Sequence, residues 1–82
     1  MNNKDLIDNI HKLHTTALGA VRIRKNLGLT VENVVDWCRE RIESDTAFIT
    51  RKGKNWYIDI EGCRITVNAY SYTLITAHKI SK

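Results

Sequence analysis

The sequence contains no proline, only two cysteines and four glycines, and no long run of apolar residues. A helix that crosses a membrane needs about 20 consecutive apolar residues, and no segment approaches this length. The first ten residues, MNNKDLIDNI, include acidic side chains and lack the apolar centre of an export signal. We therefore expect a cytoplasmic protein that has no membrane partner.

The signatures of common enzymes and metal sites are also missing. There is no phosphate-binding glycine loop, no nucleophile elbow and no carboxylate pair at a defined spacing, which predicts no cofactor. His11 and His14 are three residues apart, but no third ligand has a defined spacing, so no metal site is predicted. Cys38 and Cys63 form no CxxC pair and fall at apolar positions, which favours free, buried thiols over a disulfide.

What the chain does contain is typical of one small globular domain covering residues 1–82. Hydrophobic residues make up 43% and charged residues 27% of the 82 residues. A domain of this size buries only about 60–65% of its unfolded surface, so its core is small. Homodimerisation would be one way to enlarge that core.

Positive charge is unevenly distributed along the chain. The formal net charge is +4, and in residues 1–45 seven basic residues balance seven acidic ones. Residues 46–82 hold six basic residues against two acidic ones, so the whole excess lies there. Such clustering favours a polyanion as partner, although solubility alone would also account for a charge of +4.

Residues 1–45 show the apolar spacing of three helices. The first is expected over residues 3–13. The second is expected from a cap at Thr15 or Thr16 to Gly28, with Leu18, Val21 and Leu27 facing the core. The third is expected from a cap at Thr30 to about Ser44.

From residue 46 the apolar period changes to two, which predicts strands over residues 47–51, 55–60, 63–69 and 73–80. Glycine turns separate them. A run of helices before a run of strands indicates an α+β fold. We expect three N-terminal helices packed on one face of a four-stranded antiparallel meander, in which consecutive strands are neighbours.

The opposite face of this sheet is predicted to be mostly polar. Ile75 and Ala77 are expected to point inward, and Leu74 outward. The polar residues expected to share the outer face are Tyr57, Asp59, Arg64, Thr66, Asn68, Thr76 and His78.

This face contains the candidate catalytic residues. His78 could act as a general acid or base near neutral pH, and Arg64 could stabilise charge on a phosphorane. Asn68 and Thr76 are expected to lie close to them. The combination suits RNA cleavage without a metal, because the ribose 2′-hydroxyl can serve as the nucleophile. The alternative interpretation is that His78 is an exposed histidine without a catalytic role.

Basic residues and one tyrosine are the candidate nucleic-acid contacts. Cations beside aromatic rings can hold phosphates and stack bases, and Trp56 is expected to be buried. The candidates are Arg22 and Arg24 in the second helix, Lys52, Lys54 and Tyr57 around the first hairpin, and Lys79 near the end of the last strand. A solvated charged surface is the alternative interpretation.

Three functions remain open from these patterns. The first is RNA binding, with ribonuclease activity as an extension of it. The second is a non-catalytic module for protein interaction or homodimerisation through the sheet or its edge. The third is DNA binding by a helix-turn-helix over residues 20–39, which the acidic residues of the third helix disfavour.

Five segments, LHTTALG, RIRKNLGL, RKGKNWY, ITVNAYSYT and ITAHK, resemble a small bacterial family of uncharacterised domains. The resemblance covers nearly the whole chain and implies a single-domain cytosolic protein without an established activity. At fold level, helices followed by a four-stranded antiparallel sheet also resemble the barnase, colicin D and RelE superfold. That resemblance implies a metal-independent ribonuclease that uses residues such as His14, Arg22, Arg24, Arg64 and His78.

Overall fold

A four-stranded antiparallel sheet follows a set of short helices in the computed structural model, which describes residues 4–80. This arrangement confirms the predicted α+β class. The elements in chain order are α1 (Lys4–Asp8), the 3-10 helix η1 (Ile10–Lys12), α2 (Ala17–Leu27), α3 (Val34–Ile42), β1 (Phe48–Lys52), β2 (Asn55–Ile60), β3 (Cys63–Asn68) and β4 (Leu74–Lys79).

The strands form the predicted meander, in the order β1-β2-β3-β4. Two-residue turns join the first three strands, since Lys52 pairs with Asn55, and Ile60 pairs with Cys63. Gly53 adopts a φ of 62°, and Gly62 a φ of 76°. Such left-handed backbone matches the twist of the flanking strands and favours glycine. The two turns therefore fix the register of three strands.

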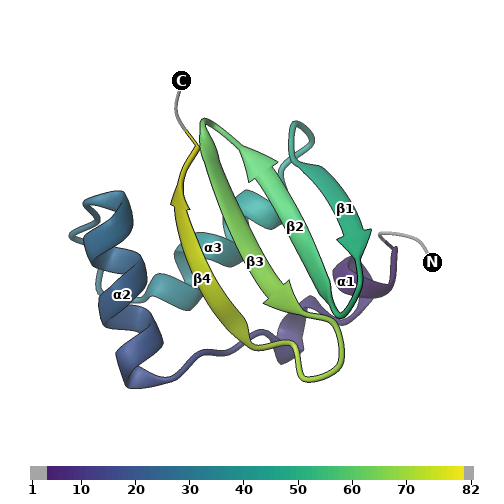
Figure 1. Cartoon of the computed structure of the whole chain (residues 1–82), viewed down its shortest axis with the longest axis horizontal. Coiled ribbons are helices and arrows are strands. Elements are labelled where there is room, and N and C mark those ends of the chain that lie inside the picture. The colour runs from purple at the N-terminus through teal and green to yellow at the C-terminus, as the bar shows by residue number, and fades with distance from the viewer. Residues whose placement is uncertain (1–3, 81–82) are drawn as a thin grey trace.

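One hydrophobic cluster joins the helices to one face of the sheet. Helix α2 lies against β4, and in Figure 1 α3 crosses behind the sheet. The predicted inward residues of β2, including Trp56 and Ile58, are buried, as expected. The buried cluster contains Leu6, Leu13, Ile23, Leu27, Val34, Cys38, Ile42, Trp56, Ile58, Ile60, Ile65, Val67, Leu74 and Ala77.

The first and third helices differ from their predicted bounds. The single helix expected over residues 3–13 is divided into α1 and η1, and residue 3 lies outside the described part of the chain. Helix α3 does not begin at Thr30, because the side chain of Asn33 caps it by accepting a hydrogen bond of 2.9 Å from Asp36 N–H. Asparagine is among the most favourable N-cap residues, and α3 starts after Asn33 instead of after Thr30.

Helix α2 has the predicted caps but turns a different face to the core. Thr16 accepts a hydrogen bond from Gly19 N–H, and Gly28 ends the helix with a φ of 66°. Gly19, Ile23 and Leu27 are buried. Leu18 and Val21 are 67% and 56% exposed, so the prediction that they face the core was wrong. Gly19 packs closely against Thr15, so a side chain at this position would force a shift.

An irregularity in β4 overturns the predicted orientation of two of its residues. Val67 pairs with Leu74 and Thr66 pairs with Thr76, so Ile75 has no partner in the ladder. Such an extra residue is a β-bulge. Leu74 is consequently buried and Ile75 is 38% exposed, the reverse of the prediction. Ala77 is buried as predicted, because the bulge lies before it.

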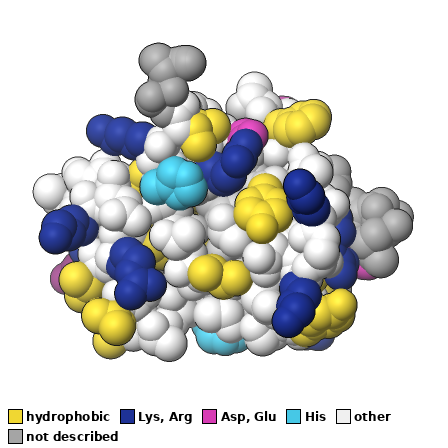
Figure 2. Space-filling view, in the orientation of Figure 1, with side chains coloured by type: hydrophobic (Ala, Val, Ile, Leu, Met, Phe, Trp, Pro, Cys, Tyr) yellow, Lys and Arg dark blue, Asp and Glu magenta, His cyan; other side chains and the backbone are white. Residues whose placement is uncertain are grey.

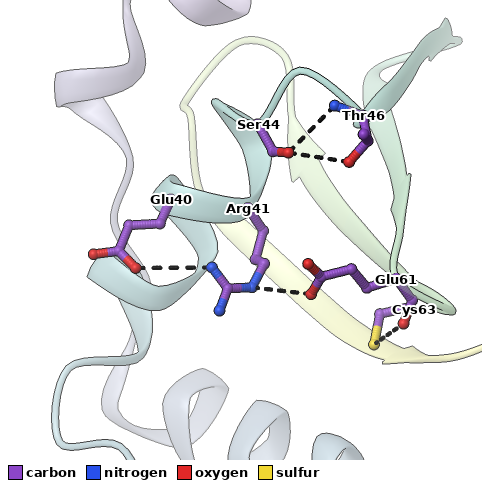
Figure 3. Close-up of polar contacts among 6 residues, drawn as sticks. All are labelled: Glu40, Arg41, Ser44, Thr46, Glu61 and Cys63. Carbon is purple, nitrogen blue, oxygen red and sulfur yellow. Dashed lines mark hydrogen bonds and ion pairs between the residues drawn. The ribbon is translucent and has the colours of Figure 1, made fainter.

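Arg41 connects α3 to the turn between β2 and β3 (Figure 3). Its guanidinium lies 4.6 Å from the centre of the Trp37 ring, and its Nε is 3.3 Å from Glu61 Oε1. The second contact is an ion pair without hydrogen-bond geometry. Glu61 itself has a φ of 52°, a left-handed conformation unusual for a residue with a side chain. Arg41 thus anchors a strained turn to the helical layer.

The two cysteines are free, as predicted. Cys38 is fully buried, and burial raises the pKa of its thiol to about 12. Cys63 is half-buried at the start of β3. A neutral, buried Cys38 behaves as a small hydrophobic residue of the core.

Candidate functional site

The face of the sheet turned away from the core cluster carries two continuous rows of outward side chains, and we call it the open face. The strand register aligns Phe48, Asp59, Arg64 and His78 in the first row, and Thr50, Tyr57, Thr66 and Thr76 in the second. Figure 2 views the molecule from this side and shows Lys and Arg side chains spread over the face and its rim, where acidic side chains are sparse.

Asp59 and Arg64 form the strongest polar contact on this face. Arg64 Nε and Arg64 Nη2 donate hydrogen bonds of 2.7 and 3.0 Å to the two carboxylate oxygens of Asp59. This bidentate geometry is the most favourable arrangement of the two groups. The hydrogen bond from Arg64 holds the pKa of Asp59 below its ordinary value, and the charge of His78 adds to this effect.

A hollow opens beside this ion pair. It has a volume of about 490 Å³ and is lined by Thr50, Lys52, Tyr57, Asp59 and Arg64. Its lining combines an aromatic ring, two cationic groups, one carboxylate and two hydroxyls. Such a set can contact a base, a phosphate and a sugar hydroxyl together.

His78 lies directly across from Arg64 in the pairing of β3 with β4, and its side chain is exposed. The structure therefore brings together the two main candidate catalytic residues. His14 lies elsewhere, because its Nε2 is 3.1 Å from Thr73 Oγ1, beyond the other end of β4. The two histidines are thus separated by most of the length of that strand and do not form an acid–base pair.

The other two candidate catalytic residues have structural contacts. The Asn68 side-chain oxygen accepts hydrogen bonds of 2.9 Å from the backbone N–H groups of Tyr70 and Ser71. It therefore shapes the loop between β3 and β4. Thr76 lies on the open face, where its hydroxyl is 3.5 Å from Asn26 Nδ2 of α2.

The two arginines of α2 have different surroundings. Arg24 Nε and Arg24 Nη2 donate hydrogen bonds of 3.1 and 2.6 Å to the carbonyls of Val31 and Glu32. Its guanidinium thus holds the connection between α2 and α3. Arg22 is exposed and lies one turn before Asn26, on the side of α2 next to β4. Only Arg22 of this pair adjoins the open face with a guanidinium free of such backbone contacts.

The remaining basic candidates border the open face at its ends. Lys52 lines the hollow, and Lys54 is exposed in the turn between β1 and β2. Lys79 is exposed at the end of β4, but it pairs with Cys63, so strand alternation turns its side chain away from the face that carries His78. Tyr57, the predicted aromatic contact, is half-buried in the hollow wall, and its hydroxyl accepts a hydrogen bond of 3.3 Å from Asn55 Nδ2.

Three members of this site escaped the sequence-based selection of site residues. Phe48 and Thr50 of β1 lie on the open face, and Phe48 is 68% exposed. Asp59 is the partner of Arg64. The signal for Asp59 was present, since a two-residue turn at Glu61–Gly62 places residues 59 and 64 opposite each other.

The described residues 4–80 contain no cluster of three or more potential metal-binding side chains. Within the same range, no helix has the length and apolar character needed to cross a membrane. The connection between α2 and α3 spans residues 28–33, longer than the three or four residues of a helix-turn-helix.

The fold and the site define a small α+β domain with an uncovered, basic sheet face. The chain belongs to the family described as "Protein of unknown function (DUF3781)", whose model matches residues 7–78. No curated protein and no solved structure matches the chain. The expected likeness to the barnase, colicin D and RelE superfold therefore stays a prediction.

Proposed function

We propose that this protein binds single-stranded RNA on the open face of its sheet. The observation that carries the proposal is the hollow lined by Thr50, Lys52, Tyr57, Asp59 and Arg64. It places an aromatic ring between cationic groups on an uncovered sheet. A base can stack on such a ring while the cations contact the neighbouring phosphates.

The charges around the hollow favour a phosphate backbone as ligand. Lys52 and Lys54 lie at the end of the open face where β1 turns into β2. Arg64 retains little net charge because Asp59 neutralises it. We therefore assign the electrostatic attraction to the lysines and Arg22, and assign Arg64 a positioning role beside Tyr57.

RNA is favoured over DNA by the hydroxyl groups next to the hollow. Thr50 and Tyr57 present side-chain hydroxyls there, and each can donate to or accept from a ribose 2′-hydroxyl. A duplex is a poorer ligand, because its bases are stacked and cannot reach the Tyr57 ring.

Binding has better support than cleavage on this face. Transesterification of RNA uses one group to take a proton and another to give one. His78 can serve in one role, but His14 is remote and Asp59 is held by Arg64. Loss of a labelled RNA during the binding assay would reveal cleavage, and His78→Ala would test its origin.

The test is fluorescence anisotropy of a labelled single-stranded oligouridine, titrated with protein at several salt concentrations. Tyr57→Ala should weaken binding about 5- to 100-fold, the range expected for one stacked base, while Tyr57→Phe should retain most of the affinity. Lys52→Ala should reduce the slope of log K against log salt by about 0.7, because one phosphate contact is lost.

Lys4→Ala provides the matched control, since this lysine lies in α1 and not on the sheet. It should leave the affinity and the slope nearly unchanged. No salt-dependent binding, or equal losses for Lys52→Ala and Lys4→Ala, would contradict the proposal. Equal binding of the corresponding DNA would contradict the role of the 2′-hydroxyl.

A further inference from the structure

The outer edge of β1 has no strand partner among residues 4–80. Strand β1 lies at the end of the sheet, and within residues 4–80 it pairs with β2 alone. Outside that ladder, no backbone hydrogen bond among the described residues involves Phe48–Lys52. Alternate residues of β1 therefore direct N–H and C=O groups away from the sheet. Natural edge strands are protected by short length, charged side chains, proline, a bulge or a covering segment, because such groups pair readily with another strand, and β1 has only its length of five residues and the charges of Arg51 and Lys52 as protection within residues 4–80.

We infer that a second copy of this chain pairs with this edge, so that the two sheets join antiparallel through β1. An antiparallel strand pair is two-fold symmetric, which is the symmetry of a homodimer. Full overlap of Phe48–Lys52 with its own copy centres the pairing on Thr50. Each end of β1 then meets the opposite end of the partner's β1.

The charges at the two ends of β1 are complementary in this pairing. Exposed Glu43 and Asp45 precede the strand, whereas exposed Lys52 and Lys54 end it. Antiparallel pairing sets the acidic end of one copy beside the basic end of the other, twice in the dimer. Parallel pairing would instead place like charges together, which is unfavourable. The self-complementary charge pattern selects a second copy as occupant and fixes its direction.

The outward side chains of β1 also fit this arrangement. In the pairing centred on Thr50, Phe48 lies opposite Lys52 of the partner subunit. The Phe48 side chain is 68% exposed in the single chain. It can cover the alkyl stem of that lysine, and the two threonines meet at the symmetry axis, a favourable cross-strand pair. The dimer would thus bury an otherwise exposed aromatic ring.

Analytical ultracentrifugation of the full chain, over a range of concentrations up to the high micromolar, tests the inference. We expect a reversible monomer–dimer equilibrium, with slower hydrogen exchange at Phe48–Lys52 as the concentration rises. Phe48→Lys should weaken association at least tenfold, because it removes the ring and sets a second positive charge opposite Lys52 of the partner subunit. The matched control is Leu18→Lys, which places the same charge at a leucine that is 67% exposed on α2, and it should dimerise normally.

Exchange of the terminal charges tests the direction of pairing. Asp45→Lys and Lys54→Glu should each weaken the dimer, and the double variant should regain much of the affinity. A chain that stays monomeric would overturn the inference, as would a dimer that Phe48→Lys leaves intact or charge exchange fails to rescue. These measurements need no RNA, so their outcome is independent of the proposed function.

Discussion

Asp59 and Arg64 illustrate how one pair of residues can organise the open face. Their bidentate contact joins β2 to β3 directly beside the hollow. Each side chain fixes the other, so that Arg64 holds a defined position in the lining of the hollow, which it shares with Tyr57. The cost is that its charge is largely satisfied within the protein, which is why the flanking lysines must attract a polyanion.

The pH dependence of stability should report this pair. Arg64 holds the pKa of Asp59 below the ordinary value of 3.8, so the folded state binds this proton more weakly than the unfolded state. The stabilisation is therefore present above pH 3.8 and is lost as the pH falls through the lowered pKa. Asp59→Asn should be less stable than the wild type at neutral pH, with the difference disappearing in acid, as measured by urea denaturation.

Arg64→Met is the companion variant, because it removes the group that lowers the pKa. It should flatten the same acidic part of the stability curve. Both effects should be modest and decrease with added salt, since the pair is partly exposed. An unchanged acidic limb in Arg64→Met would show that another group controls it.

Among the elements, the connection between α2 and α3 depends on Arg24. Its two hydrogen bonds to the carbonyls of Val31 and Glu32 hold residues 28–33, where regular structure is lacking. The same residue looked like a nucleic-acid contact in the sequence, because three basic residues follow Val21 within four positions. Chemical type alone does not distinguish a guanidinium that binds a ligand from one that binds backbone.

Arg24→Ala should therefore destabilise the fold by about 1–2 kcal/mol, the usual effect of losing charged hydrogen bonds to backbone acceptors. Arg22→Ala, two positions earlier and exposed, should change stability by less than about 0.5 kcal/mol. Thermal denaturation of both variants, followed by circular dichroism, makes the comparison. Equal effects would mean that Arg24 is not a structural residue.

Most elements could be predicted from local signals, and their orientations only in part. Thr16 and Gly28 mark the ends of α2 through backbone chemistry that depends on a few neighbouring residues. The rotation of α2 could not be predicted, because it depends on how the helix packs against β4, which lies far away in the sequence. Likewise, the start of α3 could not be predicted, because Thr30 and Asn33 are both residue types that cap helices, and the sequence does not show which of them does so.

The residues of the candidate site could be predicted only where the pairing register of the strands could be predicted. Alternation placed Tyr57 and Arg64 on one face, since tight turns leave no freedom between β1, β2 and β3. The loop of residues 69–73 between β3 and β4 is longer, and the phase of the chain changes after it, at the bulge at Ile75. Whether Asn68 faces a ligand or its own loop depends on that three-dimensional path.

At the scale of the whole molecule, one core serves both layers. The buried cluster takes side chains from α1, α2 and α3 as well as from β2, β3 and β4. Neither the helices nor the sheet has a separate core, so they should unfold together. Circular dichroism and the fluorescence of the tryptophans, including buried Trp56, should give coincident urea transitions.

Ile65→Ala should move both transitions to lower urea by the same amount. This residue is fully buried, and its truncation should cost about 2–5 kcal/mol. Ile75→Ala is the matched control, because Ile75 is 38% exposed at the bulge and should have a much smaller effect. Two separate transitions in either variant would indicate that helices and sheet fold independently.

The bulge at Ile75 also bears on how related chains should be aligned. Because this residue has no partner in the ladder, a relative that lacks it could keep Leu74 against the core and Thr76 on the open face. Elsewhere in β4, the loss of one residue would invert every side chain beyond it. A one-residue gap at position 75 is thus compatible with an unchanged core, and an alignment forced through it without a gap would equate inward residues with outward ones.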